Sequence, residues 1–449
     1  MKMKLRAAEL ERSTRCSVTP SDMPTETRRH STSRAWRYTP IIFTVQVSLL
    51  ALCAPARAQE WGPKLSLSGY GSLGIVRSSD DRSDFEIDAF KPNGPGRSRR
   101  WSADVDSRVA AQVTAEFTPE LSGILQVVSQ QRYDNSYAPT IEWANLKYQV
   151  TPDIAVRAGR IVLPVFLVSD SRKVGYANPW VRPPVEVYSL LPITSNDGVD
   201  ASFRLGWGEA TNTVQVTYGR SDTRFPGAPT AGIAKTRDLF VLVDTIEYGP
   251  VSARLSYGSA KLTIDAFKVL FDPFRQFGPV GTAIADKYTV DRKRVNFIGV
   301  GAGYDPGKWF AMVEWAKFDT RSILGARSAW YFSGGYRLGK FTPYLTYSKV
   351  KNDSNSSDPG LPVTQLPPQA AGTAVVLNAG LNALLAQTIV QKTISIGGRW
   401  DAASNIALKL QFDHVRRGAG SPGTFGNLQP GFVPGGKVSL LSATVDFVF

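Results

Sequence analysis

The sequence predicts an all-β fold, a closed barrel of sixteen antiparallel strands that crosses a membrane. Stretches with an apolar residue at every second position recur along the chain and are joined alternately by tight turns and long polar loops. After residue 58 no segment approaches the roughly 18 consecutive apolar residues of a spanning helix, so any span must consist of strands. The last stretch, "SLLSATVDFVF", places Phe449, Phe447 and Val445 on one face and Asp446 on the other.

Residues 1–58 are expected to be a signal peptide. A basic stretch precedes the apolar segment 41–54, and Ala56-Arg57-Ala58 forms a small-residue cleavage motif. The apolar segment is too short for a comfortable transmembrane helix. The stretch before it is unusually long, and Met23 is an alternative start. Residues 59–449 then form a single barrel domain.

The composition of this barrel domain excludes several classes of protein. Both cysteines, Cys16 and Cys53, lie in the leader, so an exported chain without disulfides needs another source of stability, such as a closed sheet. The precursor has a net charge of +14, but its basic residues are scattered, which disfavours nucleic-acid binding. No cofactor is expected.

The clearest strand is "RVAAQVTAEF", residues 108–117. Apolar residues alternate with polar ones over its whole length, and its two charged residues, Arg108 and Glu116, share one face. This pattern suits a strand between lipid and water. Seven such hairpins are predicted, in which residues 108–117 pair with 123–132, 141–150 with 154–160, 199–207 with 212–220, 238–248 with 251–260, 295–304 with 309–318, 329–338 with 341–350, and 391–400 with 406–415. A first strand at 64–76 and a last strand at 439–449 bring the total to sixteen.

The connections between these strands are of two kinds. The seven hairpin turns are short, whereas residues 79–100, 161–197, 261–294, 352–388 and 416–436 form long loops. This asymmetry is typical of an outer-membrane barrel. Because a sheet in lipid must satisfy all of its own hydrogen bonds, the last strand is expected to pair with the first. Aromatic residues near the strand ends fit the belts found at membrane interfaces.

On these features the chain resembles the proteobacterial outer-membrane porins, the sixteen-stranded trimeric diffusion channels. The resemblance covers the strand ladder, the terminal Phe449 and a long third loop after a strand that ends in "AGR" at Arg160. It implies a water-filled barrel narrowed by the third loop, and a homotrimer. It also implies that Phe449, Phe447 and Val445 form the signal read by the outer-membrane assembly machinery.

Selectivity in such a pore is set by charges that face the lumen and by the constriction loop. Strand parity and the charges of the third loop give the candidate pore-lining residues Arg108, Arg132, Lys147, Arg157, Arg160, Arg172, Lys173, Arg182, Glu186, Asp197, Arg204, Arg337 and Arg399. Parity also turns Glu116, Gln126, Lys409, Asp413 and Asp446 inward. Arg157 and Arg160 cannot both face inward in a regular strand. Arg160 is preferred from the resemblance, and a bulge at Gly159 would admit both.

The third loop has features of a fixed constriction. Its prolines stiffen it, and besides basic residues it carries acids that could face arginines on the wall across the pore. Two acidic stretches, 79–88 and 352–358, could bind Ca²⁺ but lack EF-hand spacing, so no metal site is assigned. The apolar residues 372–390 are expected to form a short helix against the barrel mouth or a neighbouring subunit.

These observations predict a channel for passive diffusion of small hydrophilic solutes and ions, with a weak anion preference. The alternative within transport is a channel specific for phosphate or small carboxylates. An outer-membrane hydrolase would need a histidine, and His414 beside Asp413 is the only one after residue 58, with no marked nucleophile. The chain is therefore expected not to be an enzyme, and to contact outer-membrane lipid and lipopolysaccharide.

Overall fold

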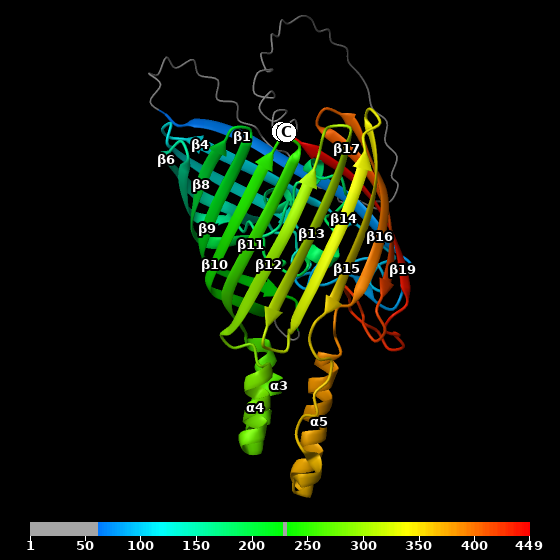
Figure 1. The fold of residues 1–449 in the computed structure, drawn as a ribbon. Coiled ribbons are helices and arrows are strands. Elements are labelled where there is room, and N and C mark those ends of the chain that lie inside the picture. Colours follow the sequence, from blue (N-terminus) through cyan, green and yellow to red (C-terminus); the bar gives the residue numbers. More distant parts are fainter. Residues whose placement is uncertain (1–61, 228–230) are drawn as a thin grey trace, which may run out of the picture. The chain divides into compact units, whose positions relative to one another are not determined.

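The computed structural model describes residues 62–227 and 231–449, and in it sixteen long antiparallel strands form one closed sheet (Figure 1). The strands are β1 (Lys64–Ser78), β4 (Arg108–Glu116), β5 (Leu121–Gln130), β6 (Thr140–Thr151), β7 (Ile154–Val162), β8 (Ser195–Trp207), β9 (Ala210–Phe225), β10 (Gly232–Tyr248), β11 (Val251–Ile264), β12 (Lys293–Tyr304), β13 (Trp309–Thr320), β14 (Ala326–Tyr336), β15 (Phe341–Asn352), β16 (Gln391–Ala403), β17 (Ile406–Arg417) and β19 (Lys437–Val448). The barrel closes where β1 pairs with β19, from Tyr70 opposite Val448 to Ser78 opposite Leu440. The predicted fold class, the seven hairpins and the two single strands are confirmed. The predicted signal peptide lies outside the described residues.

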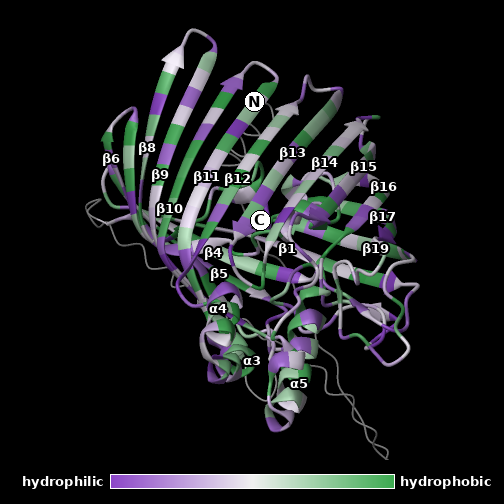
Figure 2. Ribbon diagram, turned by 60° about the horizontal axis from the view of Figure 1, so that its bottom comes forward, coloured by the Kyte–Doolittle hydropathy of each residue, from purple (hydrophilic) through white to green (hydrophobic). Residues whose placement is uncertain are grey.

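The faces of the strands are arranged as in a membrane barrel. Along β1 the side chains of Leu65, Leu67 and Leu73 are exposed, whereas Tyr70 and Ser72 are buried. Figure 2 shows the same alternation of apolar and polar residues along strand after strand. Large apolar side chains on the outer face are unfavourable in water and favourable in lipid.

The two ends of the barrel differ. Seven short turns, of two to four residues between the strand bounds, join the strands at one end. Exposed aromatic residues mark this end: Phe117, Tyr148, Trp207, Tyr248, Trp309, Tyr336, Phe341, Trp400 and Phe449. They form the aromatic belt expected at a membrane interface. The long connections lie at the opposite end and contain the strands and helices that are not part of the barrel wall.

These elements are short strands and helices. The strands are β2 (Asp84–Phe85), β3 (Trp101–Ser102) and β18 (Phe425–Gly426), and the helices are α2 (Val185–Tyr188), α3 (Lys268–Phe271), α4 (Gly278–Tyr288) and α5 (Pro368–Leu385). Single 3₁₀ turns are η2 (Ser169–Ser171), η3 (Gly175–Ala177), η4 (Asp265–Phe267), η5 (Asp272–Phe277) and η6 (Val363–Gln365). None of the helices within the described ranges is long and apolar enough to cross a bilayer.

The apolar segment 372–390 is helical through Leu385, as part of α5, but it does not pack against the barrel mouth, one of the two positions expected for it. Leu377 and Leu381 of α5 lie in a buried cluster with Phe271 and Phe274 of the loop between β11 and β12. The helix thus packs on another long loop, and not on the wall of the barrel mouth (Figure 1). The apolar composition of the segment indicates the helix but not its partner, because the two packed surfaces belong to loops distant in the chain.

Candidate functional site: the constricted lumen

The third loop is the third connection along the chain at the long-loop end, residues 163–194, and it folds into the barrel and packs against its inner wall. The ring of Phe166 lies 4.6 Å from that of Tyr188 within the loop and 5.3 Å from that of Phe297 on β12. Trp180 packs edge-on against Tyr331 of β14 at 5.8 Å. All of these side chains are buried. The loop is therefore held as a packed layer of a core and does not hang free in the pore.

Polar anchors fix the same part of the loop to β11 and β13. Arg254 and Ser256 of β11 donate hydrogen bonds to two main-chain carbonyls of the loop at 2.6 and 2.7 Å. The buried carboxylate of Glu314 on β13 accepts from the N–H of Leu167 at 2.7 Å and from the hydroxyl of Tyr188 at 2.9 Å. These bonds satisfy loop main-chain groups that would otherwise be buried unpaired.

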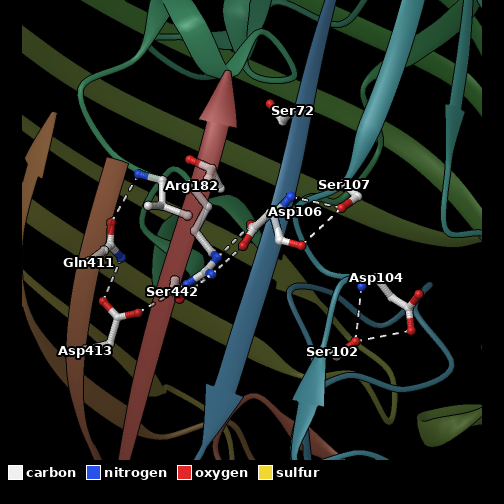
Figure 3. Close-up of polar contacts among 12 residues, drawn as sticks. Ser72, Ser102, Asp104, Asp106, Ser107, Arg182, Gln411, Asp413 and Ser442 are labelled. Atoms are coloured by element: carbon white, nitrogen blue, oxygen red, sulfur yellow. Dashed lines mark hydrogen bonds and ion pairs between the residues drawn. The ribbon is translucent and has the colours of Figure 1, made fainter. Parts of the chain in front are cut away.

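Arg182 is the charged anchor of the loop (Figure 3). Its side chain is 5% exposed and donates to both oxygens of Asp106, at 2.9 and 2.6 Å. It also donates to Asp413 of β17 at 3.1 Å and to the hydroxyl of Ser442 on β19 at 2.7 Å. The guanidinium lies over the ring of Phe85 in the first long loop. One side chain thus ties the third loop to the segment before β4 and to two strands beside the barrel seam.

Further anchors lie on β15–β19. The buried carboxylate of Glu186 accepts hydrogen bonds from Ser348, Gln391 and Thr393, with distances of 2.6 and 2.7 Å for the first two. Glu186 therefore lies between the loop and the wall and not at the pore.

Two cations of the wall hold the middle of the loop in place. Lys409 forms a buried ion pair with Asp446 at 2.8 Å and donates to two loop carbonyls at 2.7 and 2.8 Å. Arg399 donates to the carbonyl of Asn178 at 3.1 Å. Strand parity predicts that both cations face the lumen. In the structure both bind the third loop, so neither is available to attract an ion in the pore.

A cavity of ≈ 440 Å³ lies in the lumen between the third loop and the wall formed by β4–β9. Eight lining residues are basic and three are acidic, which gives this region an excess of positive charge. The basic ones are Lys91, Arg108, Arg132, Arg160, Arg172, Lys173, Arg182 and Arg224, and the acidic ones are Asp88, Asp197 and Asp222.

Three of the eight cations are paired with acids. Arg160 binds Asp197 at 2.6 Å, Lys173 binds Glu142 at 2.5 Å, and Arg182 is paired as described above. The other five take part in no ion pair within the described part of the chain: Lys91, Arg108, Arg132, Arg172 and Arg224. This unpaired charge can attract an anion that passes through the cavity.

Three of these five cations, Arg172, Arg132 and Arg224, are oriented by aromatic rings. Arg172 lies over the ring of Tyr188 at 5.3 Å and donates to that residue's carbonyl at 2.6 Å. Tyr133 lies between Arg132 and Arg224, whose guanidinium carbons are 5.5 and 5.8 Å from its ring centre. These cation–π contacts hold the guanidinium groups in place without neutralising them.

The competition between Arg157 and Arg160 is decided without a bulge at Gly159, because the pairing of β7 with β8 runs without a register shift from Arg157 to Arg160. Gly159 has φ of 125°, where a side chain would be strained, and an added Cβ would lie 2.3 Å from the carbonyl oxygen of Ala144. Arg157 pairs with the buried Asp200 at 2.6 Å, whereas Arg160 pairs with Asp197 at the cavity. Both arginines bind acids of β8, and only Arg160 lines the cavity.

The structure divides the candidate pore-lining residues into three groups. The cavity is lined by Arg108, Arg132, Arg160, Arg172, Lys173, Arg182 and Asp197. The inner face outside the cavity holds Lys147, Arg157 and Arg204, and the layer beneath the third loop holds Glu186 and Arg399. Arg337 lies at a short turn, paired with Asp305 at 2.6 Å, so it is remote from the constriction.

Two residues of the cavity and its loop contacts, Glu142 and Lys91, were not predicted from the sequence. Glu142 has outward parity, but the register of β5 and β6 shifts between Gln126 and Val127, and the side chain is buried against Lys173 and Thr194 of the loop. An acid at an apparent lipid-facing position was the available signal for this bulge. Lys91 belongs to the first long loop, which no strand pattern places.

The first long loop forms the other side of the cavity entrance. Its β2 pairs with β18 of the last loop, and the rings of Phe85 and Phe425 lie 5.6 Å apart. This pairing, with Asp80 bound to Arg417 at 2.8 Å, positions the segment that brings Lys91 to the cavity. Within the described residues no three His, Cys, Asp or Glu side chains form a potential metal site, including those of the acidic stretches in this loop and at 352–358.

Lys91 is expected to make ion selectivity depend on pH. Burial lowers the pKa of Lys91 to about 8, so its charge is present at pH 7 and largely lost at pH 9. Burial, with Asp84 and Asp88 nearby, raises the pKa of Glu86 to about 8, so a negative charge appears over the same range. Reversal potentials in a KCl gradient should show a falling anion preference from pH 7 to pH 9. The fall should be smaller in Lys91→Met and in Glu86→Gln, and a double variant with the wild-type pH profile would contradict this assignment.

Comparison with known proteins agrees with this architecture. Residues 46–419 match the model of the Gram-negative porin family. Among solved structures, the outer membrane channel DcaP of Acinetobacter baumannii is similar, with a TM-score of 0.52 and 12% identity over 87% of this chain and 99% of that one. OmpF of Salmonella typhi, in complex with daunomycin, gives 0.48 and 12% over 87% and 99%, and an anion-selective porin of Comamonas acidovorans gives 0.49 and 10% over 86% and 100%. No curated protein matches the chain in sequence.

At these identities the structural likeness bears on the fold alone, whereas the family match covers most of the chain. The chain belongs to the Gram-negative porin family and forms a diffusion channel of the outer membrane.

Proposed function

We propose that the channel is a general diffusion pore with a weak anion preference, set by the basic cavity between the third loop and β4–β9. The observation that carries this proposal is the group of five cations without acid partners around the cavity. A passing ion comes close to these charges because the third loop packs against the opposite wall of the barrel, formed by β10–β15. The anion preference follows from fixed charge, as in other pores lined by arginine and lysine.

A general pore is favoured over a channel specific for phosphate or small carboxylates. The five cations come from the first loop, β4, the loop after β5, the third loop and β9. Charges that come from separate elements attract anions in general. They do not form the continuous row of binding sites along the pore that a channel specific for phosphate or carboxylates would need. A sugar channel would need aromatic side chains along the lumen. Strand parity turns Tyr331 and Tyr344 inward, but both are buried beneath the third loop and cannot form such a track.

A role as an enzyme is disfavoured by the placement of His414. Its neighbours on the same face of β17, Leu410 and Phe412, are exposed on the outer surface. Asp413 points the other way and binds Arg182. Histidine and carboxylate therefore lie on opposite sides of the wall and cannot share a proton.

Three further features follow from the resemblance and complete the proposal. Residues 1–58 direct export and are cleaved, the mature chain assembles as a homotrimer, and the last strand is the assembly signal. In the structure Phe449 and Val445 are exposed on the outer face of β19, where another protein could contact them before the barrel closes.

The ion pair of Arg160 and Asp197 gives a controlled test of the proposed selectivity. Arg160→Ala should lower the anion-to-cation permeability ratio, since it removes a cation and leaves Asp197 unpaired at the cavity. Arg160→Ala/Asp197→Asn should restore most of the ratio, because the double change leaves the net charge unaltered. The measurement is the reversal potential of single channels in a planar bilayer under a KCl gradient. Equal ratios in all three proteins, or a cation-preferring wild type, would contradict the proposal.

A further inference from the structure

Four basic residues lie side by side on the outer face of the barrel, at its long-loop end. Cross-strand register places Lys349 of β15 opposite Lys392 of β16, Lys392 opposite Arg416 of β17, and Arg416 opposite Lys437 of β19. All four side chains are exposed and share the face of the exposed apolar residues of their strands. We refer to Lys349, Lys392, Arg416 and Lys437 as the cation row.

The cation row is electrostatically unfavourable in the isolated protein. Like charges directly opposite one another on neighbouring strands destabilise a sheet. None of the four side chains forms an ion pair or a side-chain hydrogen bond within residues 62–227 and 231–449, whereas Lys351 on the same face of β15 pairs with Asp353 at 3.1 Å. Three consecutive like-charged pairs without a counterion indicate that an anion from outside the chain binds here.

The sequence around the row contains no acid that could serve instead. Residues 359–400 and 414–445, which hold three of the four cations and the loops beside them, contain no Asp or Glu. The acids that flank the row in sequence have other partners: Asp413 and Asp446 bind Arg182 and Lys409 in the lumen, Asp353 binds Lys351 and Asp401 binds Arg399. The excess of positive charge on this face is therefore not offset by neighbouring segments.

The surroundings of the row indicate an amphiphilic ligand. Four residues further into each strand, on the same face, Leu345, Ile396, Phe412 and Leu441 form a row of exposed apolar side chains. Trp330, opposite Lys349 on β14, packs on Tyr347 at 5.2 Å, as interfacial aromatic residues do. Acyl chains would contact the apolar row while phosphates contact the cations above it.

We propose that the cation row is a binding site for the phosphates of a phosphorylated glycolipid of the outer leaflet, held across β15–β19. With strands about 4.8 Å apart, four cations span about 14 Å, enough for more than one phosphate group. Lysine and arginine clusters bind anionic headgroups, and charge-assisted bonds to phosphate are the strongest that such side chains make. Since the long loops of such barrels face outward, the row lies at the outer leaflet.

The test compares two doubly substituted proteins, refolded as full mature chains in detergent. Lys392→Gln/Arg416→Gln removes the centre of the row, and Lys308→Gln/Lys340→Gln removes two exposed cations from short turns at the opposite end. The probes are bis-phosphorylated lipid A and the same lipid after removal of its phosphates, with binding followed by native mass spectrometry.

We expect wild type and the short-turn variant to bind bis-phosphorylated lipid A at least tenfold more tightly than the dephosphorylated lipid. The Lys392→Gln/Arg416→Gln variant should lose this difference, and in the absence of lipid its melting temperature should exceed that of wild type because repulsion is relieved. Channel conductance should stay unchanged, so this result is independent of the proposed ion selectivity.

Three outcomes would overturn the proposal. The row variant could bind both lipids as wild type does, or millimolar inorganic phosphate could compete with lipid A, which would indicate a site for free anions. The row variant could also lose its oligomeric state with lipid binding intact, which would assign the row to an interface between copies. If the double substitution prevents folding, the single variants Lys392→Gln and Lys340→Gln replace the pair with the same readout.

Discussion

Replacing Arg182 by methionine is expected to release the third loop and raise single-channel conductance. The change leaves Asp106 buried without an ionic partner and removes the cation beside Asp413. Breaking a buried pair by removing one partner typically costs about 3–5 kcal/mol of folding free energy, because the remaining charge stays out of water. The expected readouts are a lower unfolding temperature and larger, noisier current steps in a planar bilayer.

Two further variants separate loop attachment from a general loss of stability. Arg337→Met removes a paired arginine of similar geometry at a short turn, and it should leave conductance unchanged. Adding Asp106→Asn and Asp413→Asn to Arg182→Met removes the two uncompensated charges, so stability should largely return. Wild-type conductance in Arg182→Met itself would show that the loop is held without this network.

Reversing the charge of Arg108 and Arg132 together is expected to turn the anion preference into a cation preference. The double change to glutamate alters the fixed charge of the cavity by four units at positions without acid partners. A unit charge 4 Å from an ion contributes about 1 kcal/mol in water, and the Debye length is about 10 Å at 0.1 M salt. A change on the order of tenfold or more in permeability ratio follows from these magnitudes.

The matched control places the same charge change on the inner wall outside the cavity. Lys147→Glu/Arg204→Glu also alters the fixed charge by four units, at residues that do not line the constriction. Its effect on reversal potential should be several-fold smaller, and both effects should shrink as ionic strength rises. Equal effects of the two double variants would mean that selectivity arises along the whole lumen.

The strands of the barrel wall could be predicted from the sequence because each strand and turn is determined by residues close together in the chain. Alternation of apolar and polar residues fixes which face each strand turns to lipid, and turn residues fix where it reverses. All sixteen long strands therefore follow from pattern alone. A helix within residues 372–390 could be expected from their apolar composition, whereas its packing on Phe271 and Phe274 could not, since that contact joins two loops.

The constriction could be predicted only in part, for physical reasons visible in single residues. Arg108 and Arg132 follow from strand parity, but Glu142 does not, because one extra residue in β6 reverses its direction. Whether a cation is free or paired depends on contacts between distant segments, as between Lys173 and Glu142 or Arg182 and Asp413. Strand parity therefore predicts which charged residues face the lumen, and the tertiary contacts determine which of these charges remain unpaired.

The seam between β1 and β19 bears on the order of folding events. Gly71 lies under the ring of Phe447, and Gly69 under that of Phe449, where an added Cβ would approach ring atoms within 2.3 Å in both cases. The two rings thus fit two gaps in the opposite strand, and a slide of the strands by two residues, which keeps the faces matched, would set one of the rings against Leu67 or Leu73. Because the seam joins the two ends of the barrel domain, it has the longest loop to close and is expected to form last. The fit of the two rings over the two glycines therefore favours the correct strand register at that final step. A seam in a shifted register lacks this fit, so the barrel reopens until the strands pair correctly.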